Sequence, residues 1–210
     1  MALVQTSSYG AAPLTGKGVA PPPPPDAVPA NTNVVGTLLV LVADAMVLGT
    51  LLAVWWVIKA GSPSWPPPGV RVNTYIPSVV AITAAMSAIS MQWMVSSIRR
   101  NDQRSAGAAL GLTLVFGVSI VTVQWYYLDT IGFGTAEHAY GTMFHLLIGY
   151  HLLHMAIAVG ALVVVGSRAM AGHFGRFGYD PLKAVSALWQ YSNVAWLAIL
   201  SALFLFSALS

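Results

Sequence analysis

The sequence contains no cysteine and very little charge. Only 7% of its 210 residues are Asp, Glu, Lys or Arg, whereas a soluble domain carries roughly 25%. This shortage excludes a soluble enzyme and a wholly disordered protein. The absence of cysteine excludes disulfides, thiolate metal sites, iron–sulfur clusters and Cys-attached haem within this chain. Nine basic residues against six acidic ones are too few and too scattered for a nucleic-acid partner.

Apolar residues dominate what is present. They make up 57% of the chain, and the mean hydropathy is +0.72. The 19 glycines and seven tryptophans fit the same class, because membrane helices tolerate glycine and membrane interfaces collect tryptophan. The composition therefore predicts an integral membrane protein.

The first 33 residues differ from the rest. They hold an unbroken proline run, 21–25, with glycines around it, and such a segment cannot bury enough apolar surface to offset its ordering entropy. We expect a disordered, cytoplasmic Pro-rich tail over 1–33. The segment also lacks the charged and apolar regions of a secretory signal peptide.

Five apolar stretches follow, each long enough for a spanning helix of roughly 20 residues. They predict an all-α fold, a polytopic bundle of five transmembrane helices. The expected spans are 34–58, 74–98, 106–128, 140–166 and 182–209. Expected helix-capping residues are Thr74, Ser105, Thr135 and Asp180, the last followed by a proline.

Lys and Arg set the expected orientation. With five spans, the N-terminus shares a side with the second and fourth loops. That side holds Lys17, Arg99, Arg100, Arg104, Arg168, Arg176 and Lys183, and the other holds Lys59 and Arg71. Seven against two predicts a cytoplasmic N-terminus and an external C-terminus. The five Arg residues on the first side are candidates for contact with lipid head groups.

One acid lies inside the predicted spans. Asp44 is near mid-depth of the first helix, and an ionisable residue there is costly enough to suggest a function. It either binds an ion, relays a proton or bonds a polar partner. His151 and His154 reach a similar depth on the fourth helix, so we expect Asp44 to pair with one of them or with Ser or Thr. The two His residues, three apart and expected to share a face of the helix, are also possible metal ligands, but no further ligand completes a site.

Other polar residues favour structural roles. Gln124 suits an interhelical hydrogen bond, and Trp125, Tyr126 and Tyr127 after it are typical of an interfacial aromatic belt. Gln190 and Asn193 on the last helix suit interhelical bonding as well.

Several motifs together resemble subunit III of the haem–copper oxidases, the cytochrome c and quinol oxidases. The segments Tyr140-Gly141-Thr142-Met143-Phe144 and Gly149-Tyr150-His151-Leu152-Leu153-His154 are similar to its Y-G-S-x-F and G-F-H-G-L-H-V motifs. The loop 65–69, W-P-P-P-G, with Asn73 and Thr74 resembles another signature. Asp44 falls where the family has a membrane acid, Gln124 and Tyr126 fit its Q-x-Y-E pattern, and Trp189 and Trp196 fit its last motif.

The resemblance covers about 34–210 and implies the five-helix bacterial form. The sequence departs from the family pattern at Tyr127, Gln190 and Asn193, which replace ionisable family residues, and at Leu152, which replaces a glycine. These departures indicate a divergent branch.

The family function gives the expected role of this chain. It implies a non-redox subunit that packs on oxidase subunit I, with subunit II in the same obligate hetero-oligomer, in a bacterial inner membrane. Catalytic and metal residues would be absent from this chain, and haem and copper would belong to the partners. Asp44, His151, His154, Gln124 and Tyr126 would be candidates for handling protons or lipid, with bound phospholipid, while the complex reduces O2 to water. The electron donor, cytochrome c or quinol, stays open.

Three alternatives remain. The first is a similar accessory subunit of another membrane complex such as a nitric oxide reductase, which the haem type and the gas consumed would distinguish. The second is a small proton channel or transporter built around Asp44, which predicts transport by the isolated chain. The third is a b-type cytochrome that uses His151 and His154, which predicts a haem spectrum.

Overall fold

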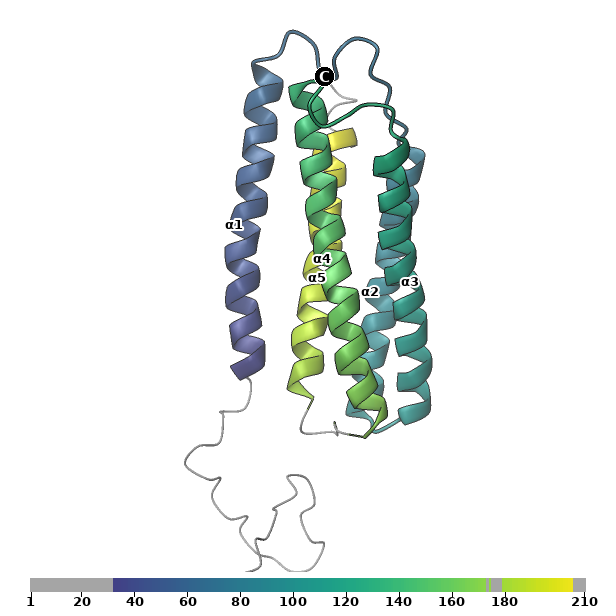
Figure 1. The fold of residues 1–210 in the computed structure, drawn as a ribbon. Helices are drawn as coiled ribbons and strands as arrows, with labels where there is room; N and C mark the ends of the chain where they lie inside the picture. The colour runs from purple at the N-terminus through teal and green to yellow at the C-terminus, as the bar shows by residue number, and fades with distance from the viewer. Residues whose placement is uncertain (1–31, 173, 175–178, 206–210) are drawn as a thin grey trace, which may run out of the picture.

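The computed structural model describes residues 32–172, 174 and 179–205. Within these residues the chain forms five long helices and no strand (Figure 1). Their bounds are α1 Thr32–Ala60, α2 Tyr75–Arg99, α3 Gln103–Thr130, α4 Ala139–Met170 and α5 Asp180–Leu200, with a π-helical turn η1 at Ser201–Leu205. Most of the expected tail, Arg176 and the end of the fifth expected span lie outside the described residues.

All five helices are long and apolar enough to cross a membrane. They extend past several of the expected limits, most clearly in α4, which continues to Met170. The physical reason is that an apolar run marks only the hydrocarbon-spanning part. A helix continues into the head-group region through polar residues such as Lys59 and Arg168, which lie in the last turns of α1 and α4.

Two helix starts have a different residue at the expected cap. Asp102, not Ser105, caps α3, and its carboxylate accepts a hydrogen bond from the Ser105 amide at 3.1 Å. His138, not Thr135, caps α4, and its Nδ1 accepts from the Gly141 amide at 2.7 Å. The reason is that capping depends on which residue directly precedes the first helical turn, and each of these helices begins a few residues away from the position that composition alone suggests.

The other two starts also shift. Thr74 precedes α2 without a side-chain cap bond, and Asn73 accepts from the Tyr75 amide instead, at 2.8 Å. Asp180 is the first residue of α5 rather than the residue before it. Its carboxylate pairs with Lys183 at 2.8 Å within the first turn.

The helices do not pack evenly. α5 packs against α1, α2 and α4, while α2 packs along α3 and α3 along α4. α1 contacts mainly α5 and is the least buried of the five. In Figure 1 it stands at one side of the bundle.

Two glycines permit close approach of α3 to α4 and α5. A Cβ at Gly117 of α3 would lie 2.5 Å from the Trp189 ring and 2.7 Å from Val159. A Cβ at Gly166 of α4 would lie 2.6 Å from Leu110. These contacts show why small residues recur here, because they let helix backbones come close.

An aromatic cluster closes the end of the bundle that holds the α1–α2 and α3–α4 loops. Trp65 from the first loop packs between Trp55 of α1 and Tyr140 of α4, with ring centroids at 4.8 and 5.0 Å. Phe133 from the α3–α4 loop packs on Phe144 at 5.4 Å. Trp65 of the α1–α2 loop therefore links α1 to α4 through aromatic packing.

Candidate functional site

A polar cluster joins α1, α4 and α5 at the middle of the bundle. Asp44 lies 12 residues after the first residue of α1, which corresponds to about 18 Å along the helix axis. Its Oδ2 accepts a hydrogen bond from the Tyr150 hydroxyl at 2.5 Å and lies 3.0 Å from His154 Nε2. The expected pairing of Asp44 with a histidine of the fourth helix is confirmed.

A tyrosine pair extends this cluster to α5. The hydroxyls of Tyr150 and Tyr191 lie 2.7 Å apart. Because the Tyr150 hydroxyl donates to Asp44, the Tyr191 hydroxyl must donate to Tyr150. Sequence reasoning missed both tyrosines. The available signal was the position of Tyr150 four residues before His154, on the same face of the helix.

His154 contacts the cluster through both ring nitrogens. Its Nδ1 lies 2.7 Å from the Tyr150 carbonyl oxygen, which can only accept, so Nδ1 carries a hydrogen. Its Nε2 lies 3.0 Å from Asp44 Oδ2, which is ion-pair distance when the imidazole is protonated.

This cluster borders an open pocket of about 500 Å³. The pocket follows one face of α1 from Thr32 to Asp44, and His154, Ile157 and Leu188 form its other wall. Polar and small residues of α1, namely Thr32, Asn33, Gly36 and Thr37, line the part nearest the helix start. The pocket thus borders α1 from its first residue to Asp44.

His151 does not act with His154. It is fully buried, its Nδ1 lies 2.8 Å from Gln124 Oε1 on α3, and its ring packs on Trp196 at 4.8 Å. The expectation that the two histidines share a face, and so could bind one metal, is wrong in this respect. Residues three apart on a helix differ by about 60° in direction, which is enough to contact different neighbouring helices.

No three His, Asp or Glu side chains among the described residues gather as a metal site would require. His145 is the remaining histidine of α4. Its Nδ1 contacts the Gly141 carbonyl at 2.8 Å, and its ring packs on Phe133. It contributes to the aromatic cluster and not to the Asp44 site.

The residues near the end of α3 are partly buried in the bundle and partly exposed on its surface. Gln124 makes the expected interhelical bond to His151. Trp125 and Tyr126 are exposed, as an interfacial belt requires, so Tyr126 lies apart from Asp44. Tyr127 is wrongly assigned to that belt, because it is buried and its hydroxyl donates to the Asn73 carbonyl at 2.8 Å.

The last helix bonds to α2, as expected for its neutral polar residues. Gln190 donates to the Ala88 carbonyl at 3.1 Å, and Asn193 donates to the Ser87 hydroxyl at 3.4 Å. Trp189 donates to the same hydroxyl at 3.1 Å. These bonds hold α5 in the position where Tyr191 reaches the Asp44 cluster.

Four arginines gather at the bundle end where α1 begins. Arg99 and Arg100 end α2, Arg104 lies in the first turn of α3, and Arg168 lies in the last turn of α4. These helix ends lie on one side of the molecule (Figure 1). Between them is Asp102, whose pKa is held below its usual range by hydrogen bonds with Ser105.

Comparison with known proteins gives a consistent result. The family model for cytochrome c oxidase subunit III matches residues 31–208. A cytochrome c oxidase subunit 3 from Thermostichus vulcanus is 22% identical over 176 residues, which cover 82% of this chain and 87% of the relative. The Synechocystis protein of the same name is 25% identical over 166 residues, covering 78% and 71%. The Paracentrotus lividus protein is 30% identical over 137 residues, covering 64% and 52%.

Proposed function

The chain belongs to the cytochrome c oxidase subunit III family, and from this premise we propose that it supports proton uptake, lipid binding and stability in a respiratory haem–copper oxidase. In this proposal it packs on subunit I, with subunit II in the same complex. The haems and copper belong to those partners, which reduce O2 to water. This chain supplies no redox ligand.

The Asp44–His154 contact carries the proton-handling part of the proposal. In this proposal Asp44 and His154, whose Oδ2 and Nε2 lie 3.0 Å apart, share one proton that either group can hold. The Tyr150 hydroxyl donates to Asp44 Oδ2, and the Tyr191 hydroxyl bonds to the Tyr150 hydroxyl. With these bonds the proton moves between Asp44 and His154 without leaving an unpaired charge in the membrane. Such a group stores a proton near a partner that consumes protons.

The adjoining pocket supports a route to this store. It runs from the start of α1 to Asp44, and the start of α1 shares its end of the bundle with Arg99, Arg100, Arg104 and Arg168. Basic residues mark the cytoplasmic side of a membrane protein. We therefore place that end in the cytoplasm of a bacterial inner membrane, the side from which an oxidase takes up protons.

The same basic residues favour contact with anionic lipid. Their long side chains reach the phosphates at the membrane surface while their stems stay along the helices. In our proposal Arg99, Arg100, Arg104 and Arg168 hold phospholipids of the cytoplasmic leaflet. Arg176 belongs to this group by its sequence position.

Replacing Asp44 by Asn in the assembled oxidase tests the proton-handling role. The amide would keep the size of the side chain but could not share a proton with His154. We expect unchanged haem content, with fewer protons pumped per electron or a shorter catalytic lifetime during continuous turnover. Proton release per electron and activity loss over time measure this in reconstituted vesicles.

Asp102→Asn is the matched control, since it removes the same charge from the water-exposed α2–α3 turn. It should leave pumping and lifetime at wild-type values. Wild-type pumping and lifetime in the Asp44→Asn complex would refute the proton-handling role. Loss of haem from that complex would refute the non-redox assignment.

A further inference from the structure

Tyr150 and Tyr191 carry hydroxyl groups where the family pattern has none. The motif G-F-H-G-L-H-V, which the segment 149–154 resembles, has phenylalanine at the position of Tyr150. The last family motif, W-H-F-x-D-x-x-W, has phenylalanine at the position of Tyr191. The two added hydroxyls lie 2.7 Å apart, although they come from α4 and α5. The tyrosine pair is therefore a feature of this chain that the family pattern does not account for.

Tyr150 contacts both Asp44 and His154. Its hydroxyl donates to Asp44 Oδ2 at 2.5 Å, and its backbone carbonyl accepts from His154 Nδ1 at 2.7 Å. Its ring packs on the His154 imidazole, with the ring centroids 4.2 Å apart. A hydroxyl donor stabilises a carboxylate, whereas a carbonyl oxygen and an aromatic ring stabilise a cation. All three contacts of Tyr150 thus favour the charged forms of its neighbours.

The hydrogen-bond lengths also favour a charged Asp44. Bonds from a hydroxyl to a carboxylate are about 2.5–2.7 Å long, and those to a neutral oxygen are about 2.7–2.8 Å long. The Tyr150–Asp44 bond of 2.5 Å fits a carboxylate acceptor, and the 2.7 Å between the two tyrosine hydroxyls fits a neutral one. No Lys or Arg lines the pocket beside Asp44. Among the residues of that pocket, only His154 can balance the charge of the carboxylate.

Tyr191 acts on Asp44 through Tyr150. Its hydroxyl donates to the Tyr150 hydroxyl, and a hydroxyl that accepts a hydrogen bond becomes a stronger donor, because bonds in a chain polarise one another. The position of Tyr191 is fixed by the bonds of Gln190 and Asn193 to α2. The chain of two hydroxyls therefore links the packing of the last helix to the charge on Asp44.

We propose that Tyr150 and Tyr191 are positioning residues, which keep the shared proton on His154 so that Asp44 rests as a carboxylate. This inference rests on the proposed function, because it concerns the same proton. The tyrosines do not carry that proton. When either hydroxyl is removed, the carboxylate loses stabilisation. The proton then moves across the contact: the N–H bond at His154 Nε2 breaks, and an O–H bond forms at Asp44 Oδ2.

Infrared spectroscopy of the assembled oxidase in reconstituted membranes tests the position of the proton. The spectrum of wild type minus that of Asp44→Asn isolates the bands of the Asp44 carboxyl group. We expect carboxylate bands in wild type and no carbonyl stretch of a protonated acid. Tyr150→Phe and Tyr191→Phe should each gain that carbonyl stretch, and adding Asp44→Asn should remove it. The gain should be larger in Tyr150→Phe, which loses the bond to Asp44 itself.

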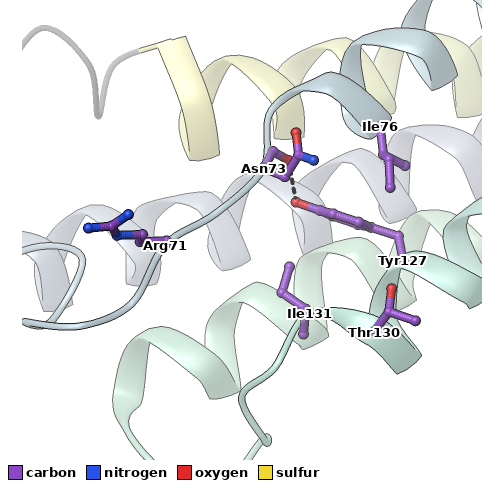
Figure 2. Close-up of a pocket in the computed structure, with 6 residues that line it drawn as sticks. All are labelled: Arg71, Asn73, Ile76, Tyr127, Thr130 and Ile131. Atoms are coloured by element: carbon purple, nitrogen blue, oxygen red, sulfur yellow. Dashed lines mark hydrogen bonds between the residues drawn. The ribbon is translucent and has the colours of Figure 1, made fainter.

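Phenylalanine is the family residue at both positions, so we expect both variants to fold and assemble. Tyr127→Phe is the matched control. The Tyr127 hydroxyl donates to the Asn73 carbonyl at 2.8 Å, in a pocket that Arg71 also lines and that contains no carboxylate (Figure 2). Removing it takes away a tyrosine hydroxyl without affecting an acid, and the spectrum should keep its wild-type acid bands.

Three results would overturn the inference: a protonated Asp44 in wild type, no new acid band in Tyr150→Phe and Tyr191→Phe, or the same new band in Tyr127→Phe. The inference and the proposed function can fail separately. The infrared band decides where the proton rests, and proton pumping by Asp44→Asn decides whether the oxidase uses it. A new acid band together with wild-type pumping in Asp44→Asn would support the tyrosine assignment and refute the proton-handling role.

Discussion

Two polar centres lie three residues apart on α4, and they have opposite surroundings. His154 faces the loosely packed side, where Asp44 of α1 is half-buried and borders a pocket. His151 faces the densely packed side, where its side-chain partner is Gln124 of α3, an amide that is fully buried. The first centre contains an acid and is accessible, whereas the second contains a neutral amide and is sealed.

This difference assigns different roles to two histidines of one helix: His154 to the proposed function and His151 to the stability of the bundle. In the proposed function, a proton reaches the Asp44 centre along the pocket and is held by Asp44 and His154. The Gln124–His151 bond has no comparable access, and its value is to satisfy one buried polar atom on each side chain, Gln124 Oε1 and His151 Nδ1. A histidine in a membrane helix is therefore informative only together with the residues that face it.

The largest expected effect on stability comes from overpacking the densely packed side of the bundle. Gly117→Val would place new atoms against Trp189 and Val159, where even a Cβ lies at 2.5 and 2.7 Å. Overpacking of this kind costs about 1–3 kcal/mol and sometimes more, so we expect a large drop in the thermal unfolding midpoint in detergent.

Gly111→Val, on the same helix, is the control. A Cβ at Gly111 would have no atom of another element within 4 Å. It should leave the midpoint near wild type. Equal stability of the two variants would mean that the α3 interface is looser than described.

A smaller loss is expected when the sealed bond is broken. Gln124→Leu leaves His151 Nδ1 without its partner in a dry interior, at a cost of about 1–3 kcal/mol. Adding His151→Phe should restore most of the stability, since both polar groups are then gone. Proton pumping by the properly assembled fraction should stay normal in both variants. A pumping defect in Gln124→Leu alone would remove the distinction between the two centres.

The smallest stability change should come from the open centre. His154→Gln removes the shared proton but leaves Asp44 bonded to Tyr150 and near the pocket. Because His154 and Asp44 are both only partly buried, we expect stability to fall by only about 0.5–1.5 kcal/mol, with a pumping or lifetime defect equal to that of Asp44→Asn. Combining the two substitutions should add no further functional loss. An additive loss would show that Asp44 and His154 act separately.

Much of the fold follows from the sequence. Long apolar runs predicted five helices, because a membrane leaves few other ways to satisfy the backbone. Equal depth correctly predicted that Asp44 meets a histidine of α4. Depth follows from residue counting at a fixed rise per residue, so it is available before any packing is known.

Direction around the helix axis was harder to predict. His151 and His154 were expected to share a face, yet about 60° of rotation sends them to α3 and α1. Tyr127 was assigned to the surface belt with Trp125 and Tyr126 for the same reason. Which neighbour a side chain meets depends on how close the helices approach, and that depends on residues such as Gly117, whose role appears only in the packed structure.

The contacts of α1 also have a consequence for biosynthesis. Of the five helices α1 is made before the others, yet it packs mainly on α5, which is made after the other four. Asp44 and Tyr150 are 106 residues apart, which at ribosomal rates is roughly 5–20 s of synthesis. The first helix is therefore inserted early but docked late, and a chain that ends before α5 would leave Asp44 without Tyr191 and α1 without its main support.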